Sequence, residues 1–246
     1  MGDKTSVGFG ENATNPKMYF DGVEESYHHE FIGSAESLFA FADSVNKGGD
    51  KWTGQKVLLV SDIDLENKDW ESIGQTGATE FKGIFDGQNH TISNLHVDSL
   101  AQTGGSYSSG LFGWAESGVT IKNVKVDGAS IKGNHNVAVI VGYTYSGIIT
   151  NCHVSNADIV CNHANGEACG DKCGIIVGYA SDKSSIRGCS AEACTVKAGR
   201  DAGQLVGCGY KVSMSGCSAT DVTVSATGDC NEEANINNAL IGRVMD

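Results

Sequence analysis

Gly110-Leu111-Phe112-Gly113 opens a pattern that recurs along the chain between residues 110 and 226. In each copy, a short run of mostly apolar residues that ends in glycine is followed by a segment in which apolar and polar residues alternate. The runs lie at 110–113, 139–142, 175–178 and 204–207, and a further run stands at 239–242. Self-similarity of this kind indicates a repeat architecture.

The alternating segments share one register. Val124 and Val126 in one copy correspond to Cys152 and Val154 in the next, and most of the residues between such positions are polar. Alternation with a period of two predicts strands with one buried face. Short strands cannot bury that face alone, but stacked copies build a continuous core. We therefore predict an all-β fold, a right-handed parallel β-helix.

One position in each copy favours a left-handed backbone. Asn94, Asn123, Asn151, Gly188 and Gly216 align with one another. Asn and Gly share little except tolerance of positive φ. We expect a tight bend at this position in every coil, with the three asparagines stacked as an amide ladder.

The glycine motif also resembles a known family. Residues 110–113, with the related forms at 140–143 and 176–179, resemble the GLUG-motif repeats of bacterial surface proteins. The segments 57–65, 81–87 and 90–95 are similar to the N-terminal half of such domains. The resemblance covers about residues 31–246, although later copies lose the first glycine of the motif. It implies a secreted or surface-attached protein, including large multidomain proteases, and it implies no particular reaction.

Composition limits the class of partner. The 246 residues suit one β-rich domain and carry a net charge of −13. Binding to nucleic acid or to an anionic membrane requires clustered Lys and Arg, so we expect neither partner. No stretch has the length of apolar residues that a membrane span needs, and no signal peptide is visible at Met1. The family resemblance favours an extracellular or cell-surface location over a cytoplasmic one, and we expect a monomer.

The N-terminal part differs from the repeats. Residues 1–30 are polar and aperiodic, and we expect an arm that is loosely ordered or packed on the first coil of a β-helix domain at 31–246. Residues 34–47 are expected to form a helix, with Ser34 as its N-cap and an apolar stripe. An open end of stacked strands exposes its core, so we interpret this helix as a cap. The stripe consists of Leu38, Phe41, Ala42 and Val45.

The repeat sorts the nine cysteines into groups. Four fall at inward positions, where a free cysteine packs as a small apolar residue: Cys152, Cys189, Cys194 and Cys217. Four others are expected in loops that leave one edge of the stack: Cys161, Cys169, Cys173 and Cys230. For these, a disulfide, free thiols and a zinc site remain alternatives. Cys208 follows the repeat glycine, and we expect it to be exposed or half-buried.

Two further features lie outside the core positions. Asp62 and Asp64 are expected to point outward, where they bind a cation, act as an acid–base pair or bond to nearby turn amides; the last is the simplest interpretation. The repeat from Ile149 to Ile186 is longer than its neighbours because of the insertion at 161–173. Segments 98–109 and 225–238 occupy the corresponding place in other copies, so we expect three loops on one edge.

The candidate ligand-binding residues are Trp114, Tyr143 and Tyr179, each of which follows the repeat glycine. Cys208 and Arg243 continue this column. Exposed aromatic rings at strand spacing would dock sugar rings or peptide side chains, whereas buried rings would only pack over the glycine. No catalytic, cofactor or metal motif accompanies them.

These patterns favour a non-catalytic extracellular module of a bacterial surface protein. Its expected role is adhesion, ligand binding, including carbohydrate binding, or spacing, and its expected partner is an extracellular glycan or a cell-surface protein. Two alternatives remain. The first is a polysaccharide-degrading lyase or hydrolase, whose site would be built from side chains on adjacent coils. The second is an accessory domain of a larger secreted protease.

Overall fold

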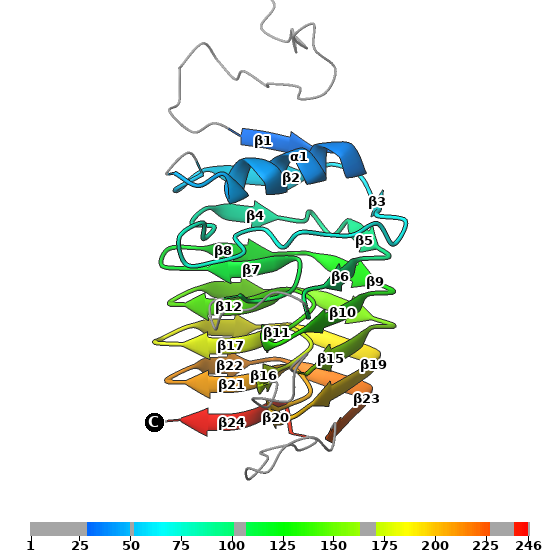
Figure 1. Cartoon of the computed structure of the whole chain (residues 1–246). Coiled ribbons are helices and arrows are strands. Elements are labelled where there is room, and N and C mark those ends of the chain that lie inside the picture. The colour runs from blue at the N-terminus through cyan, green and yellow to red at the C-terminus, as the bar shows by residue number, and fades with distance from the viewer. Residues whose placement is uncertain (1–28, 50–51, 101–106, 163–170, 227–238, 246) are drawn as a thin grey trace, which may run out of the picture.

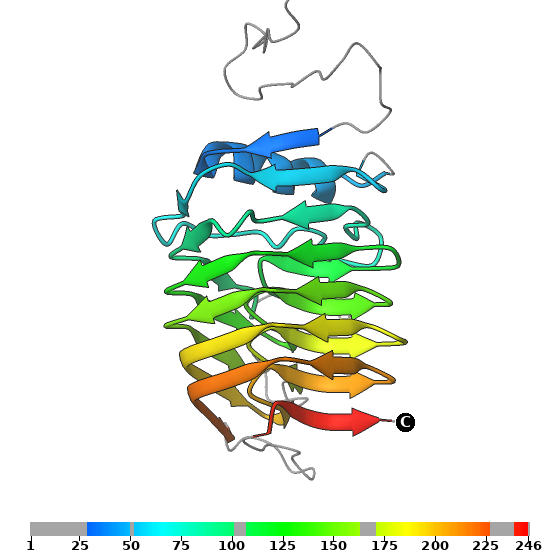
Figure 2. The same ribbon diagram turned by 180° about the vertical axis from the view of Figure 1, so that it is seen from behind.

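A computed structural model describes residues 29–49, 52–100, 107–162, 171–226 and 239–245. The described part is made of parallel β-sheets with one short helix. Figures 1 and 2 show strands stacked along the long axis of the molecule, with the helix at one end and the last strand at the other. Residues 1–28, most of the predicted arm, lie outside this description, as do residues 101–106, 163–170 and 227–238, where the sequence predicted loops.

Four sheets run along the stack. The seven-stranded sheet has the order β1 (His29–Ile32), β2 (Lys56–Leu59), β4 (Ile84–Asp86), β8 (Thr120–Lys122), β13 (Ile148–Thr150), β18 (Ser185–Arg187) and β22 (Ser213–Ser215). The nine-stranded sheet contains β3 (Ile63–Asp64), β5 (Thr91–Ser93), β9 (Lys125–Asp127), β14 (His153–Ser155), β19 (Ser190–Ala198), β15 (Asp158–Cys161), β10 (Ser130–Gly133), β6 (His96–Asp98) and β23 (Ser218–Ala226). The three-stranded sheet contains β11 (His135–Val137), β16 (Asp171–Cys173) and β20 (Arg200–Ala202). The five-stranded sheet contains β7 (Phe112–Ala115), β12 (Val141–Tyr145), β17 (Val177–Ser181), β21 (Val206–Tyr210) and β24 (Ile241–Met245).

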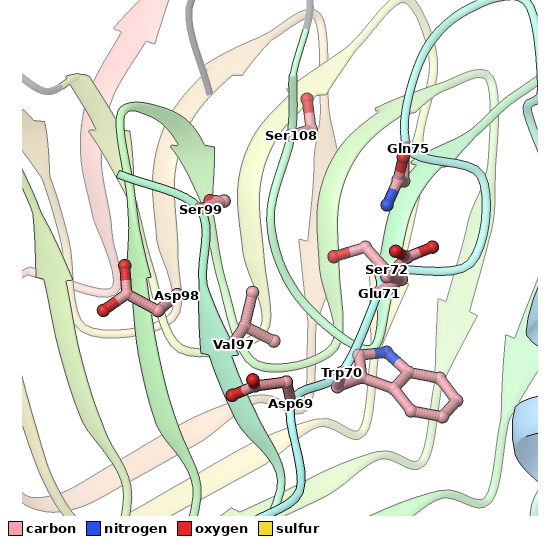
Figure 3. A pocket seen from close by; sticks show the side chains of 9 residues that line it. All are labelled: Asp69, Trp70, Glu71, Ser72, Gln75, Val97, Asp98, Ser99 and Ser108. Atoms are coloured by element: carbon pink, nitrogen blue, oxygen red, sulfur yellow. The ribbon is translucent and has the colours of Figure 1, made fainter. Parts of the chain in front are cut away.

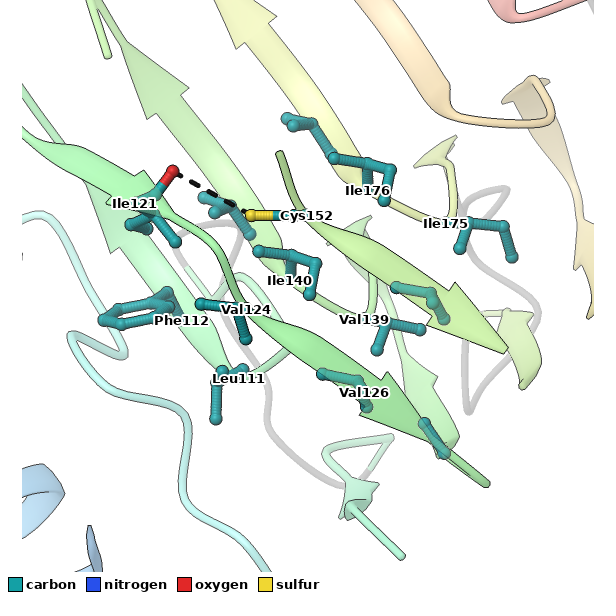
Figure 4. Close-up of a cluster of buried hydrophobic side chains, with 14 of the residues drawn as sticks. Leu111, Phe112, Ile121, Val124, Val126, Val139, Ile140, Cys152, Ile175 and Ile176 are labelled. Atoms are coloured by element: carbon teal, nitrogen blue, oxygen red, sulfur yellow. Dashed lines mark hydrogen bonds between the residues drawn. The ribbon is translucent and has the colours of Figure 1, made fainter. Parts of the chain in front are cut away.

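Equivalent residues of successive repeats lie side by side in these sheets. Ile149 pairs with Ile121 of one neighbour and Ile186 of the other, and all three are fully buried. The inward side chains of all the repeats therefore meet in one core, part of which Figure 4 shows around Val124, Ile140 and Cys152. The predicted alternation of buried and outward residues is confirmed for these strands.

The predicted left-handed bend is confirmed at Asn123, Asn151, Gly188 and Gly216, whose φ angles lie between 53° and 63°. Asn94 also has a positive φ of 57°, but its predicted alignment was wrong. Ile92 pairs with Val126 rather than with Ile121, which places Asn94 at the next corner of the repeat. An Asn-after-strand pattern occurs at both corners, so it could not distinguish them.

The amide ladder is shorter than we expected. Asn151 donates to the side-chain oxygen of Asn123 at 3.4 Å, and Asn123 donates in turn to Asp86 at 2.9 Å. Asn94 instead donates to Asp64 at 2.8 Å, because it lies at the other corner. The ladder therefore links two asparagines and ends on a carboxylate.

The repeat glycines lie where two backbones come into contact. A Cβ atom on Gly178 would lie 2.5 Å from the carbonyl carbon of Asn136 and 2.6 Å from both the Val137 nitrogen and the Gly142 oxygen. Real Cβ atoms do not approach backbone this closely. The same restriction applies at the glycines that occupy this place in the other repeats: Gly113, Gly142, Gly207 and Gly242. The motif glycine therefore lets the five-stranded sheet pack directly against the neighbouring backbone, which at Gly142, Gly178, Gly207 and Gly242 belongs to the three-stranded sheet.

The helix forms where the sequence predicted it. α1 spans Ala35–Asn46, and Ser34 caps it by accepting a hydrogen bond from the Ser37 amide at 3.2 Å. All four residues of the predicted apolar stripe are buried. Phe41 packs edge-on against Trp52 and Phe81, with ring centroids 4.9 Å and 5.7 Å away. The helix thus covers the core at the end of the stack that begins with β1 and β2.

The cysteines are free thiols wherever the structure describes them, and several are more deeply buried than we expected. Cys152, Cys189 and Cys194 point inward as predicted, whereas Cys217 is only half-buried because β22 and β23 end the stack. The prediction of an exposed or half-buried Cys208 was wrong, since this residue is fully buried.

The loop assignment was wrong for Cys161 and Cys173. These two residues end β15 and β16, so both are fully buried, and the inserted segment is confined to the residues between them. Cys169 and Cys230 lie outside the described residues.

Asp62 and Asp64 are exposed, as predicted, and both bond to nearby turns. Asp62 accepts from the Thr91 amide at 2.9 Å, and Asp64 accepts from Asn94 and from the Glu66 amide, each at 2.8 Å. The Thr91 amide and the His90 ring hold the pKa of Asp62 below its usual value. These contacts support the turn-binding interpretation of the pair.

We predict that Gly178→Ala lowers the free energy of unfolding by about 1–3 kcal/mol, because backbone atoms block the added methyl group. Gly77→Ala is the matched control, since its new Cβ would meet only the Trp114 ring at 3.4 Å. Urea denaturation measures both variants. Equal stability of the two variants would show that the backbone contact at Gly178 does not require glycine.

We predict that Cys152 and Cys189 resist alkylation in the native protein, whereas Cys217 reacts faster, because only Cys217 reaches solvent. Alkylation followed by peptide mass spectrometry locates the label. Cys189→Ser should cost about 1–3 kcal/mol of stability if the buried hydroxyl is left without a partner. Rapid native labelling of Cys189 would contradict the register described above.

Candidate binding face

Three aromatic residues form a row on the outward side of the five-stranded sheet. Trp114 pairs in register with Tyr143, and Tyr143 pairs with Tyr179. The ring centroids are 4.3 Å apart in the first pair and 5.4 Å apart in the second, with tilts of 53° and 50°. All three residues are half-buried. The row thus combines side-by-side packing with a solvent-accessible surface.

The repeat glycine fixes the position of each ring. Trp114, Tyr143 and Tyr179 each follow a glycine that lies in close contact with a neighbouring segment of backbone, so the next side chain must point outward. The Trp114 ring lies over Gly77, where an added Cβ atom would be 3.4 Å from it, and the Tyr143 hydroxyl is 3.1 Å from the Ser181 hydroxyl. Burial raises the pKa of Tyr179. The rings are therefore held in place before any ligand arrives.

The residues that continue this column after Tyr179 are not aromatic. Its next members in register are Cys208 and Arg243. Cys208 is fully buried and leaves no side chain at the surface, whereas Arg243 is exposed. The aromatic row therefore has three members and is followed by a cation.

A second column runs beside the row, on the three-stranded sheet. Asn136, Lys172 and Asp201 are the middle residues of β11, β16 and β20, and all have a positive φ, between 47° and 61°. The Lys172 ammonium lies 5.5 Å from the centre of the Tyr179 ring, within the range of a cation–π contact. The two columns thus meet at Tyr179.

Two buried carboxylates, those of Asp171 and Asp201, form ion pairs with the cationic side chains beside this second column. The Asp171 carboxylate contacts three side chains. It lies 2.6 Å from the Nδ1 atom of His135, 2.5 Å from the Lys172 ammonium and 3.1 Å from the Arg200 guanidinium. Burial alone would raise the pKa of Asp171, but the hydrogen bonds from His135 and Lys172 and their positive charge outweigh it and hold this pKa well below its usual range. Asp171 is therefore a buried anion at neutral pH.

A second carboxylate extends the chain of charges. Asp201 accepts from Arg243 at 3.2 Å and lies 3.9 Å from the Nε atom of Arg200. Only 5% of the Asp171 side chain and 1% of the Asp201 side chain are exposed, against 24% for Lys172, 29% for Arg200 and 43% for Arg243. The cations thus lie nearer the solvent than the carboxylates that hold them.

A polar pocket of about 210 Å³ lies near the Trp114 end of the row. Figure 3 shows its side chains, which come from the segments 69–75 and 97–99 and from Ser108. Ser108 and Gln75 also flank Gly113, the residue before Trp114. Three carboxylates stand at the pocket, on Asp69, Glu71 and Asp98.

The sequence predicted the aromatic row. It did not predict the cluster of ion pairs around Asp171 and Asp201, or the pocket. The strands β11, β16 and β20 were not recognised, because the predicted insertion at 161–173 included β16 and hid the equivalence of Asp171 with His135 and Arg200. A signal was present: Val137, Cys173 and Ala202 each stand five residues before a repeat glycine. The pocket is assembled from three separate segments and leaves no local pattern.

Among the described side chains, no group of three or more His, Cys, Asp and Glu residues is placed to bind a metal ion. The described ranges also contain no helix that is long and apolar enough to cross a membrane.

Comparison with known proteins gives one relative and one structural neighbour. No known protein-family profile matches the chain. Halomucin of Haloquadratum walsbyi is 35% identical over an alignment of 133 residues, which covers 50% of this chain but only 1% of halomucin. The crystal structure of a candidate immunoglobulin A1 protease from Bacteroides ovatus is similar, with a TM-score of 0.59 and 20% identity. The similarity covers 84% of this chain and 64% of that one, and at this identity it shows a shared fold alone.

We predict that Asp171→Asn destabilises the protein at pH 7 by about 3–5 kcal/mol, because it removes the buried anion that His135, Lys172 and Arg200 share and leaves these half-buried groups without it. An aspartate whose pKa is lowered by folding stabilises the protein above its unfolded pKa, near 3.9, and this contribution is lost as the pH falls further. The difference in unfolding free energy between wild type and variant should therefore shrink below about pH 4. Urea denaturation as a function of pH measures it.

Asp43→Asn is the control for this series, since 63% of the Asp43 side chain is exposed. It should change the stability little at any pH. A constant difference between wild type and Asp171→Asn down to pH 2 would contradict the assignment of Asp171 as the titrating group.

Proposed function

We propose that this chain is a right-handed parallel β-helix module of the GLUG-motif type that works outside the cell and binds a glycan without catalysis. The aromatic row, Trp114, Tyr143 and Tyr179, is the proposed contact surface. The parallel sheets, the equivalence of successive repeats and the glycine at each corner support the β-helix. The fold shared with a candidate immunoglobulin A1 protease and the match to a short stretch of halomucin are compatible with a surface or secreted module.

The observation that carries this proposal is the half-buried state of three aromatic rings on one outward face. Rings that only shielded the sheet would be covered, and rings without support would be mobile. Successive rings stand about one strand spacing apart, about 4.8 Å, which is comparable with the length of one sugar ring. Aromatic residues supply large rigid contact area at low entropic cost, and they concentrate binding energy in interfaces.

Two observations favour alternative functions. The pocket beside Trp114 carries three carboxylates, and a pair of carboxylic acids is the usual apparatus of glycoside hydrolysis. The shared fold with a candidate protease is compatible with an accessory domain of a larger enzyme. Release of reducing ends from a bound polysaccharide would favour the hydrolase. Binding to a protein substrate without any glycan binding would favour the accessory domain.

We predict that Tyr143→Ala and Tyr179→Ala each weaken binding to polysaccharides roughly tenfold, because each removes one stacking surface. Affinity electrophoresis in gels that contain a panel of neutral and acidic polysaccharides measures the loss. Tyr143→Phe should retain most of the binding, since the ring remains and only the hydroxyl contact with Ser181 is lost.

Ile148→Ala is the control for surface apolarity, because Ile148 is 46% exposed on the seven-stranded sheet. It should bind like the wild type. Thermal unfolding of every variant separates loss of binding from loss of structure. If both tyrosine variants lose stability but keep their retardation in every gel, the row is structural and the proposal fails.

A further inference from the structure

We infer that the Tyr179 end of the row binds carboxylate-bearing sugars, so that the glycan of the proposed function is an acidic polysaccharide. This inference rests on the proposed function and adds the class of its ligand. The evidence for it is the cluster of ion pairs around Asp171 and Asp201, which lies beside Tyr179. Stacking of a sugar on the aromatic row would not require these charges.

The local charge at this end is opposite to that of the whole protein. The chain carries a net charge of −13, yet three cations, Lys172, Arg200 and Arg243, accompany two carboxylates, Asp171 and Asp201. The carboxylates are 5% and 1% exposed, so a ligand that approaches meets mainly the cations above them. The buried carboxylates hold the cations in place, and the outward surface keeps an excess of positive charge.

The cations stand where a substituent of a stacked sugar would reach them. Lys172 lies 5.5 Å from the centre of the Tyr179 ring. Arg243 follows Tyr179 by two positions in the same column, a separation of about 10 Å at the usual strand spacing. A sugar ring on Tyr143 and Tyr179 would therefore direct an acidic group toward Lys172, and the next residue of the polymer would direct one toward Arg243.

The chemistry of these cations suits a carboxylate. A guanidinium presents five N–H donors in a fork that matches a carboxylate, and Arg243 can bond to Asp201 and still offer other donors. Charge-assisted hydrogen bonds are stronger than neutral ones, so each such contact favours an acidic sugar over its neutral counterpart. A polyanion with two or more charges on each sugar residue is a poorer ligand than one with a single carboxylate, because the acidic remainder of the protein repels it more strongly.

Polygalacturonate and its methyl ester test this inference, because they share one sugar backbone and differ only in whether the carboxyl group is ionised or methyl-esterified. We expect biolayer interferometry to give at least tenfold tighter binding of polygalacturonate at low salt, and a smaller difference at high salt. Lys172→Gln and Arg243→Gln should each remove most of this preference by weakening the binding of polygalacturonate far more than that of the methyl ester. Thermal unfolding checks that each variant remains folded. Arg243→Lys should keep part of it, since the charge remains.

Lys197→Gln is the matched control, because it removes one exposed positive charge from the nine-stranded sheet, whereas the row lies on the five-stranded sheet. It should keep the full preference for polygalacturonate. Equal affinity for the acid and the ester would overturn this inference while leaving the proposed function intact. Binding of neutral polysaccharides but of neither galacturonan would overturn it as well. Failure to bind any polysaccharide would reject both proposals together.

Discussion

The contact of one backbone with another at the repeat glycine is the constraint on which the rest of this structure depends. At Gly178 the strand β17 lies so close to Asn136 and Val137 that no Cβ atom fits between them. The same approach recurs at each equivalent glycine, so every repeat turns the same corner in the same way. Side chains before the glycine then enter the core, and the side chain after it must face outward.

This corner explains why a candidate binding face exists. A residue that follows the glycine has a fixed position, and its counterparts in the neighbouring repeats lie in register with it. A row of rings therefore needs no loop to position it. The left-handed middle residues of β11, β16 and β20 stand beside the row. Buried Asp171 and Asp201 hold their cations toward the solvent, so the face is rigid. Its Trp114 end is aromatic, whereas its Tyr179 end also carries positive charge.

The sequence predicted those features that every repeat carries, and it failed where the repeats differ. Alternation identified the buried faces of the strands, and the tolerance of Asn and Gly for positive φ located the bend at Asn123 and its equivalents. Asn94 was assigned to the wrong corner because both corners use the same residue types. The burial of Cys208 was missed, since the position after the glycine is outward in the aromatic repeats and a small residue there can be covered. Long-range pairing of Asp171 with Arg200 leaves no local pattern at all.

The central claim is that the outward residues after the repeat glycines form the ligand-binding face. A crystal structure of the protein soaked with a galacturonate oligosaccharide tests it most directly. The account predicts sugar rings against Tyr143 and Tyr179, with carboxylates near Lys172 and Arg243. Sugar bound instead in the pocket between Asp69 and Asp98, with the tyrosine row uncovered, would contradict it.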